Sequence, residues 1–227
     1  MLGLDPITPP LQHSSTPVAV RQPSVTTKHW SVFHQRTGRA VIRAFVAIEI
    51  DHAILQGIFA TTDELRQKIS GIRWTPQTNC HLTLKFLGDV DGEQIEAIGH
   101  VLERELSLFP RFTINAKGLG VFPDATRPRV LWVGVEGKPL AELAERVEKA
   151  LASLGFAPEK RKFTPHLTIG RWRQFKRSDK DLTDALAKWQ ERDFGGSTVH
   201  EVVVFQSILN SSGAEYRRLK AARLGDP

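Results

Sequence analysis

The chain has 227 residues, of which 41% are hydrophobic and 25% charged, values that are ordinary for a globular protein able to bury a sizeable core. No apolar run approaches the ~20 residues of a membrane-spanning helix, and no secretory signal pattern opens the chain, so no membrane partner is expected. The single cysteine, Cys80, excludes an internal disulfide and predicts a reducing, cytoplasmic location. The net charge is +6, and residues 1–40 supply +3 of it through four basic residues and one acidic residue.

The first 40 residues differ in character from the rest. They carry many Pro, Ser and Thr residues without a sustained hydrophobic period, which predicts a flexible N-terminal extension over 1–40. The folded domain is expected over 41–227, with elements assigned from their hydrophobic periods. These are strands at 41–48, 80–87, 111–121, 129–136, 163–170, 199–209 and 214–220, and helices at about 52–69, 91–108, 140–154 and 178–189.

Several predicted boundaries have suitable cap or turn residues. Asp51 can cap the first helix, and Ser178 with Asp181 fits a capping box for the last one. Gly155 is placed to end the third helix, and Asn210 to Gly213 fit the turn between the final two strands.

One four-residue phrase occurs twice. His81-Leu82-Thr83-Leu84 returns 85 residues later as His166-Leu167-Thr168-Ile169, each within a predicted strand. Residues two apart in a strand share a face, so each copy presents an imidazole beside a hydroxyl. Two such strands facing one cleft could perform acid–base chemistry on a small phosphate without a metal. The alternative is a pair of buried strands with incidental His and Thr, the latter chosen for its branched side chain.

The repeated strand also bears on the fold. Each half of the sequence contains one copy, and strands are followed by hairpin-like partners as well as by helices. The pattern predicts an α+β fold of two pseudo-symmetric lobes, with mostly antiparallel sheets flanking a central cleft and helices on the outer faces.

Other kinds of chemistry find little support. Cys80 and His81 are adjacent in a strand and face opposite ways, which disfavours a Cys/His nucleophile. No His, Cys, Asp or Glu cluster has metal-ligand spacing and no glycine-rich phosphate loop occurs, so neither a metal nor a cofactor is predicted.

A basic cluster surrounds the second copy of the phrase. Between 160 and 177 the chain holds seven basic residues and no acidic one. This favours an anionic partner such as nucleic acid, although a solvated basic loop explains any one of them equally well. The seven are Lys160, Arg161, Lys162, Arg171, Arg173, Lys176 and Arg177.

These motifs resemble the two-histidine phosphoesterase superfamily and, within it, the RNA 2',3'-cyclic phosphodiesterases, also called 2'-5' RNA ligase-like proteins. The resemblance covers about 180 residues, from Arg43 to Leu219, and leaves 1–40 outside it. It lies in Arg43 to Ile48, His81 to Gly88, Gly120 to Pro123, Pro165 to Arg171, Phe205 to Ser207, and Tyr216.

The resemblance implies hydrolysis of a 2',3'-cyclic phosphate at an RNA 3' end, leaving a 2'-phosphomonoester. His81 would be the proton donor to the leaving 3'-oxygen and His166 the proton acceptor from water, an assignment that the sequence alone leaves open. Thr83 and Thr168 would donate hydrogen bonds to the phosphate oxygens. The reaction could also run as a reversible 2'-5' RNA ligation.

The resemblance adds Arg171 against the phosphate and Phe86 stacking on the terminal base, each five residues after its histidine. An offset of five reverses the face of a regular strand, so Arg171 needs a bulge, which Gly170 allows, and core packing is an equal reading of Phe86. Lys85 should share the face of His81 and is a further phosphate candidate, the alternative being a solvated strand end.

The leading hypothesis is therefore a metal-independent phosphodiesterase acting on RNA 3' ends or small cyclic nucleotides, expected to be a monomer. One alternative is a two-histidine enzyme for another cyclic nucleotide or a 2'-5' oligonucleotide. The other is a nucleotide- or RNA-binding module without turnover.

Overall fold

The computed structural model describes residues 41–173, 180–211 and 213–226. The chain divides into two units, residues 1–38 and 39–227, and all described residues belong to the second. The predicted extension over 1–40 lies outside the described residues, as does the predicted cap at Ser178.

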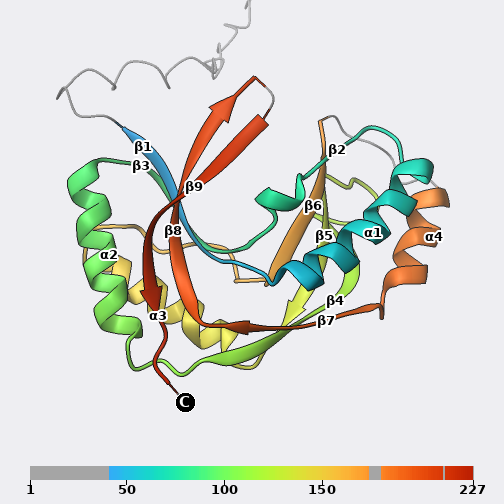
Figure 1. The fold of residues 1–227 in the computed structure, drawn as a ribbon. Helices are drawn as coiled ribbons and strands as arrows, with labels where there is room; N and C mark the ends of the chain where they lie inside the picture. Colours follow the sequence, from blue (N-terminus) through green and yellow to red (C-terminus); the bar gives the residue numbers. More distant parts are fainter. Residues whose placement is uncertain (1–40, 174–179, 212, 227) are drawn as a thin grey trace, which may run out of the picture. The chain divides into compact units, whose positions relative to one another are not determined.

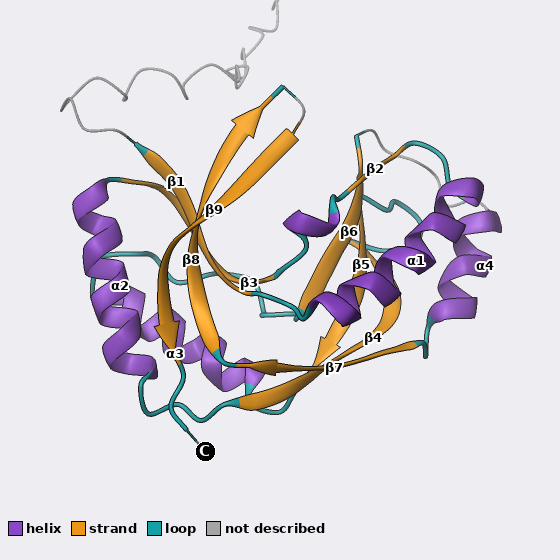
Figure 2. Cartoon of the chain, viewed as in Figure 1, coloured by secondary structure: helices purple, strands orange, loops and turns teal. Residues whose placement is uncertain are grey.

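The described part contains nine strands in one sheet, and every pairing between named strands is antiparallel. The strand order is β7-β4-β5-β6-β3-β1-β8-β9, and β2 also pairs with β6 (Figures 1 and 2). The strands are β1 (Ile42–Ile48), β2 (Ile72–Trp74), β3 (Leu82–Val90), β4 (Phe112–Phe122), β5 (Val130–Glu136), β6 (His166–Trp172), β7 (Asp193–Val199), β8 (Glu201–Asn210) and β9 (Gly213–Arg223). The helices are α1 (His52–Lys68), α2 (Gly92–Leu106), α3 (Leu140–Ala152) and α4 (Lys180–Trp189), with a short 3-10 turn, η1 (Gln77–Asn79).

The sheet consists of two halves that meet between β3 and β6. The first lobe holds β3, β1, β8 and β9, and helices α2 and α3 pack against β9 and β3. The second lobe holds β6, β5, β4, β7 and β2, and helices α1 and α4 pack against β7 and β4 (Figure 1). The predicted α+β class with two lobes of antiparallel strands is confirmed.

The lobes are not the two successive halves of the sequence. Strands β8 and β9 come from the end of the chain, yet they extend the lobe that contains β1. Conversely, α1 follows β1 in sequence but packs in the other lobe. The chain therefore crosses between the lobes several times, including after β1, between β2 and β3, and between β7 and β8.

Helix boundaries follow from apolar spacing and end groups. In α3, the apolar residues at the predicted spacing are buried, and the helix ends as Gly155, at φ +87°, donates from its N–H to the Ala152 carbonyl. Helix α2 has a capping box, in which Asp91 and Gln94 each accept from the other's backbone N–H. Asp51 occupies the N-cap position of α1, but its side chain makes no cap hydrogen bond, contrary to expectation.

The structure adds two strands to those predicted. β2 has only three residues, too short for an alternating pattern to show. β7 contains Gly195 and Gly196, residues typical of loops, and forms because β4 pairs with six of its seven residues. None of the helices in the described ranges is long and apolar enough to cross a membrane.

Two apolar clusters lie in the described residues. The large one joins the helices to the sheet, while the small one consists of Phe45, Ala47, Val203 and Phe205 with Tyr216 packed against it. Because side chains alternate along β1, the small cluster lies on the sheet face opposite the α2 side of the lobe. This aromatic face of the first lobe carries part of the candidate site.

Candidate active site

The two repeated strands are direct neighbours at the centre of the sheet. Leu82 in β3 is the antiparallel partner of Leu167 in β6, and both leucines are fully buried. Continuing this register by one residue on each side places Thr83 opposite His166 and His81 opposite Thr168. The two imidazoles and two hydroxyls therefore share the other face of the sheet, where all four residues are half-buried.

Both strands contain a bulge at the same place after the histidine. In β3, Thr83 is opposite Ala47 but Lys85 is opposite the adjacent Val46, so Leu84 is the extra residue. A bulge of this kind interrupts the alternation of faces, and the residue that follows it points the opposite way from a regular strand.

The equivalent bulge in β6 lies at Ile169. Thr168 is opposite Trp132, and Gly170 is opposite the adjacent Leu131. As a result, the seven residues from each histidine onward show the same sequence of buried, half-buried and exposed positions. The two copies are structurally equivalent over 81–87 and 166–172.

The bulges bring Phe86 and Arg171 to the face of the histidines. Phe86 is 68% exposed, and its ring lies 6.3 Å from Phe45, whose ring stacks at 4.7 Å on His81. Arg171 is exposed, and its Nη2 lies 3.5 Å from Thr168 Oγ1. Phe86 is thus not a core residue, and the bulge near Gly170 that Arg171 required is present.

Lys85 does not lie on this face, and the prediction that it shares the face of His81 is wrong. The bulge at Leu84 turns it into the interior, where it is 5% exposed. Its Nζ donates to Glu148 Oε2 in α3 at 2.6 Å and to the Ala157 carbonyl at 2.8 Å. Lys85 therefore anchors α3 to β3.

His81 lies in an aromatic surround. Its ring stacks on Phe45 and meets the Tyr216 ring edge-on at 5.1 Å, and its Nε2 lies 3.0 Å from Thr83 Oγ1. Burial lowers the pKa of the His81 imidazole from 6.5 to about 4, and the nearby charges of Arg171 and His166 also lower it, against a hydrogen bond to the backbone of Asn79. In the free protein His81 is therefore neutral at pH 7.

His166 has a matching environment in the second lobe. Its Nδ1 lies 2.7 Å from the Thr164 carbonyl, which can only accept, so Nδ1 carries the proton and Nε2 has a free lone pair. The Phe122 ring meets it edge-on at 4.9 Å, and Trp132 lies at 6.4 Å. Burial lowers the pKa of His166, with the Arg171 charge adding to this effect and the Thr164 hydrogen bond opposing it.

The aromatic residues that pack against the two imidazoles were not predicted as site residues from the sequence. Phe45, Phe122 and Tyr216 do lie in the segments that carry the family resemblance, which was the signal available. Trp132 lies outside these segments, and the sequence held no signal for it.

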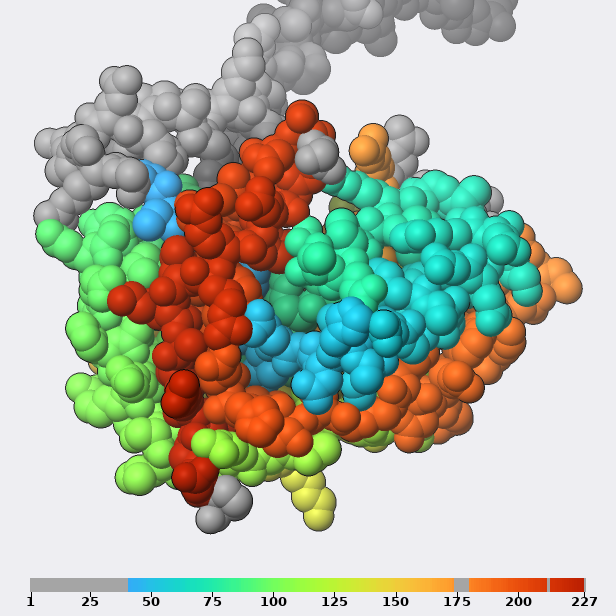
Figure 3. Space-filling model, in the orientation of Figure 1, coloured from blue at the N-terminus to red at the C-terminus, as the bar shows by residue number. Residues whose placement is uncertain are grey.

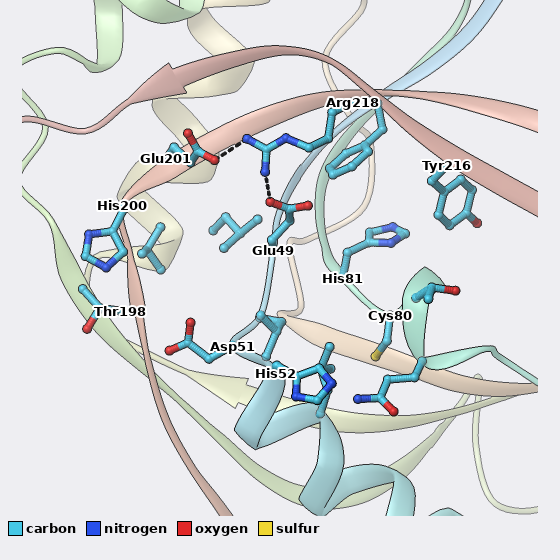
Figure 4. A pocket seen from close by; sticks show the side chains of 17 residues that line it. Glu49, Asp51, His52, Cys80, His81, Thr198, His200, Glu201, Tyr216 and Arg218 are labelled. Carbon is cyan, nitrogen blue, oxygen red and sulfur yellow. Dashed lines mark hydrogen bonds and ion pairs between the residues drawn. The ribbon is translucent and has the colours of Figure 1, made fainter.

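A cavity of about 570 Å³ opens beside His81 (Figure 4). Arg218 stands in its wall and forms ion pairs with both Glu49 and Glu201. His81 is the only predicted site residue that lines it. The space-filling view shows a recess between the red β8–β9 residues and the cyan to blue residues around α1 and η1 (Figure 3).

Cys80 also lines this cavity, but burial raises the pKa of its thiol to about 12, so it is not a thiolate nucleophile. In the ranges that the structure describes, no three His, Cys, Asp or Glu side chains are grouped so that they could hold a metal ion.

A curled antiparallel sheet with two equivalent His/Thr strands paired at its centre is the architecture of a two-histidine phosphoesterase. The family model described as LigT like Phosphoesterase matches the chain twice, over residues 48–132 and 133–216, and the chain belongs to this family. The first match contains His81 and the second His166.

Two relatives that match this chain over nearly their whole length support this membership. A protein of Aquifex aeolicus named RNA 2',3'-cyclic phosphodiesterase is 39% identical over 82% of this chain and 98% of its own. A Methanocaldococcus jannaschii protein of the same name is 35% identical over 79% and 99%.

Solved structures show the same fold. TT0787 of Thermus thermophilus aligns with a TM-score of 0.69 at 23% identity, covering 82% of this chain and 99% of that one. Escherichia coli LigT complexed with 3'-AMP aligns with a TM-score of 0.65 at 25% identity, with the same coverage.

Proposed function

We propose that the protein hydrolyses the 2',3'-cyclic phosphate at an RNA 3' end to a 2'-phosphomonoester. The main support is the pairing of Leu82 with Leu167, because this register gathers both His/Thr pairs on one exposed face. The names of the relatives from Aquifex aeolicus and Methanocaldococcus jannaschii support the substrate.

In the proposed mechanism, His166 is the general base. Its Nε2 takes a proton from water as the water oxygen attacks phosphorus, and the Thr164 carbonyl that holds Nδ1–H stabilises the resulting imidazolium. The bond from phosphorus to the 3'-oxygen breaks, and His81 gives that oxygen a proton. The product keeps its phosphate on the 2'-oxygen.

Charge on the phosphate is met by the neighbouring donors. Thr83, Thr168 and Arg171 would hold the non-bridging oxygens, where negative charge develops in the transition state. The bound anion also favours the imidazolium form of His81, which is needed for proton donation although its pKa is low in the free protein.

The same residues can serve a ligation. If an RNA 5'-hydroxyl replaces water as the nucleophile, attack on phosphorus with loss of the 3'-oxygen gives a 2'-5' phosphodiester and a free 3'-hydroxyl. We therefore propose that any ligase activity uses the same two histidines and is reversible.

The test is product analysis on an RNA ending in a 2',3'-cyclic phosphate, with and without EDTA. We expect the 2'-phosphate as product and the same rate in both conditions, since the proposed steps use only side chains. A 3'-phosphate product would mean that the 2'-oxygen, and not the 3'-oxygen, is the leaving group. Loss of activity with EDTA would refute the metal-free mechanism. Binding without turnover would favour the nucleotide-binding module.

The pH dependence follows from the two lowered pKa values. Both histidines titrate below 6.5 in the free protein, so kcat/KM should be bell-shaped with its maximum below pH 6.5. Because an anion favours the charged imidazole, adding inorganic phosphate should raise the pKa of His81 above about 4 in an NMR titration. A flat profile between pH 5 and 8, or an unmoved His81 titration, would count against paired imidazoles.

A further inference from the structure

A second arginine lies directly beside Arg171. In the register of β2 and β6, Arg73 is the partner of Arg171 and Trp74 is the partner of Gly170. A side chain at Gly170 is excluded because its Cβ would lie 2.6 Å from Cγ2 of Ile72. β2 therefore packs Ile72 and Trp74 toward the core, and the alternation of faces places Arg73 on the exposed face with Arg171.

This arrangement places two like charges in one cross-strand pair. Directly opposed residues have Cβ atoms about 4.5–5.5 Å apart, and like charges at such positions destabilise the sheet. An anion bound beside the pair would be attracted by both guanidinium groups. Arg171 already reaches Thr168 and influences both histidines, so Arg73 is one strand farther from the reacting centre.

Arg73 is held in place by the other lobe. A Cβ on Gly213, at the start of β9, would lie 2.7 Å from Nη2 of Arg73, so the guanidinium packs against the hairpin backbone. The neighbouring Ala214 carbonyl accepts from Asn79 Nδ2 at 2.6 Å. Arg73 therefore spans from β2 to the tip of the β8–β9 hairpin.

The first lobe carries an aromatic ring at the position of Arg171. Phe86 is the counterpart of Arg171, and its partner on β1 is Phe45, whereas the partner of Arg171 on the equivalent strand, β5, is Val130. Arg73 on β2 therefore adds a guanidinium group that the strands paired with β3 in the described part of the chain do not repeat. This asymmetry suits a nucleotide chain whose terminal base stacks on Phe86 and whose phosphates lie toward the second lobe.

We infer that Arg73, beside Arg171, forms a second phosphate subsite that binds the phosphodiester on the 5' side of the terminal nucleotide, while Arg171 stays on the reacting phosphate. The inference deepens the proposed function and rests on it for the position of the reacting phosphate. It predicts that the preferred substrates are RNA strands of at least two nucleotides and not mononucleoside cyclic phosphates.

The experiment compares a mononucleoside 2',3'-cyclic phosphate with a short RNA that ends in the same cyclic nucleotide. For R73Q we expect kcat/KM to fall about tenfold on the RNA, the loss of one charged hydrogen-bonding contact, and to stay unchanged on the mononucleoside. R73K should recover most of the loss because it keeps the charge. R104Q, at an exposed position on α2, removes the same charge and should match the parent protein on both substrates.

Two outcomes would overturn the subsite while leaving the proposed function intact. Equal losses of kcat/KM on the two substrates would mean that Arg73 contacts the reacting phosphate or stabilises the fold. No loss on either substrate would mean that Arg73 does not contact the RNA. If the parent protein turned over neither substrate, the proposed function would fail. The subsite would then be tested by measuring how strongly the protein binds an RNA with a 3'-terminal 2'-phosphate at several salt concentrations. The slope of log affinity against log salt should fall by about one phosphate contact in R73Q and stay unchanged in R104Q.

Discussion

Replacing His166 by Ala should lower the turnover of an RNA 2',3'-cyclic phosphate on the order of 10²–10⁴-fold, the usual contribution of a general base. His81→Ala should cause a loss of similar size because protonation of the 3'-oxygen is also required. Both residues are half-buried and neither belongs to the large apolar core, so the folded state should persist, which circular dichroism can check.

The two variants should differ in their pH profiles. Loss of the base should remove the acidic limb of the bell, and loss of the acid should remove the basic limb. His100→Ala is the matched control, since His100 is exposed on α2 and should be replaceable without effect. A near-normal rate for His166→Ala would disprove the assigned base, and exchanged limbs would mean that the two roles are reversed.

Replacing Lys85 by Met should destabilise the protein by about 3–5 kcal/mol, since it leaves the Glu148 carboxylate without its cationic partner in a largely buried position. The value should lie toward the lower end because the Glu148 side chain keeps 22% exposure. Denaturant unfolding measures the loss. Per folded molecule, kcat/KM should be unchanged, since Lys85 faces away from the histidines.

A double variant separates the ion pair from the packing around it. K85M together with E148L should recover most of the lost stability, because a buried ion pair can often be replaced by apolar residues at little cost. If K85M instead abolished activity at unchanged stability, Lys85 would belong to the site after all.

These two predictions illustrate what the sequence could and could not supply. Periodicity was sufficient for the large elements and for the shared face of each His/Thr pair, because these depend only on neighbours in the chain. The position of Lys85 depends on a bulge at Leu84, which is created by the register between β1 and β3 and leaves no local trace in the sequence.

Long-range partners explain the other differences. β7 contains two adjacent glycines and becomes a strand only because β4 is available, and β2 is recognisable only beside β6. For the same reason, the sequence did not reveal that Arg73 lies beside Arg171, because 98 positions separate the two residues. Local patterns therefore predicted the chemistry better than the surroundings in which it acts.

The exchange of strands between the lobes has a consequence for how the molecule comes apart. The two halves of the sequence that match the family model, 48–132 and 133–216, each contribute elements to both lobes, so either half alone would leave apolar surface uncovered where the other half packs against it. Neither half can act as an autonomous folding unit, and the two must gain and lose their structure in one cooperative transition.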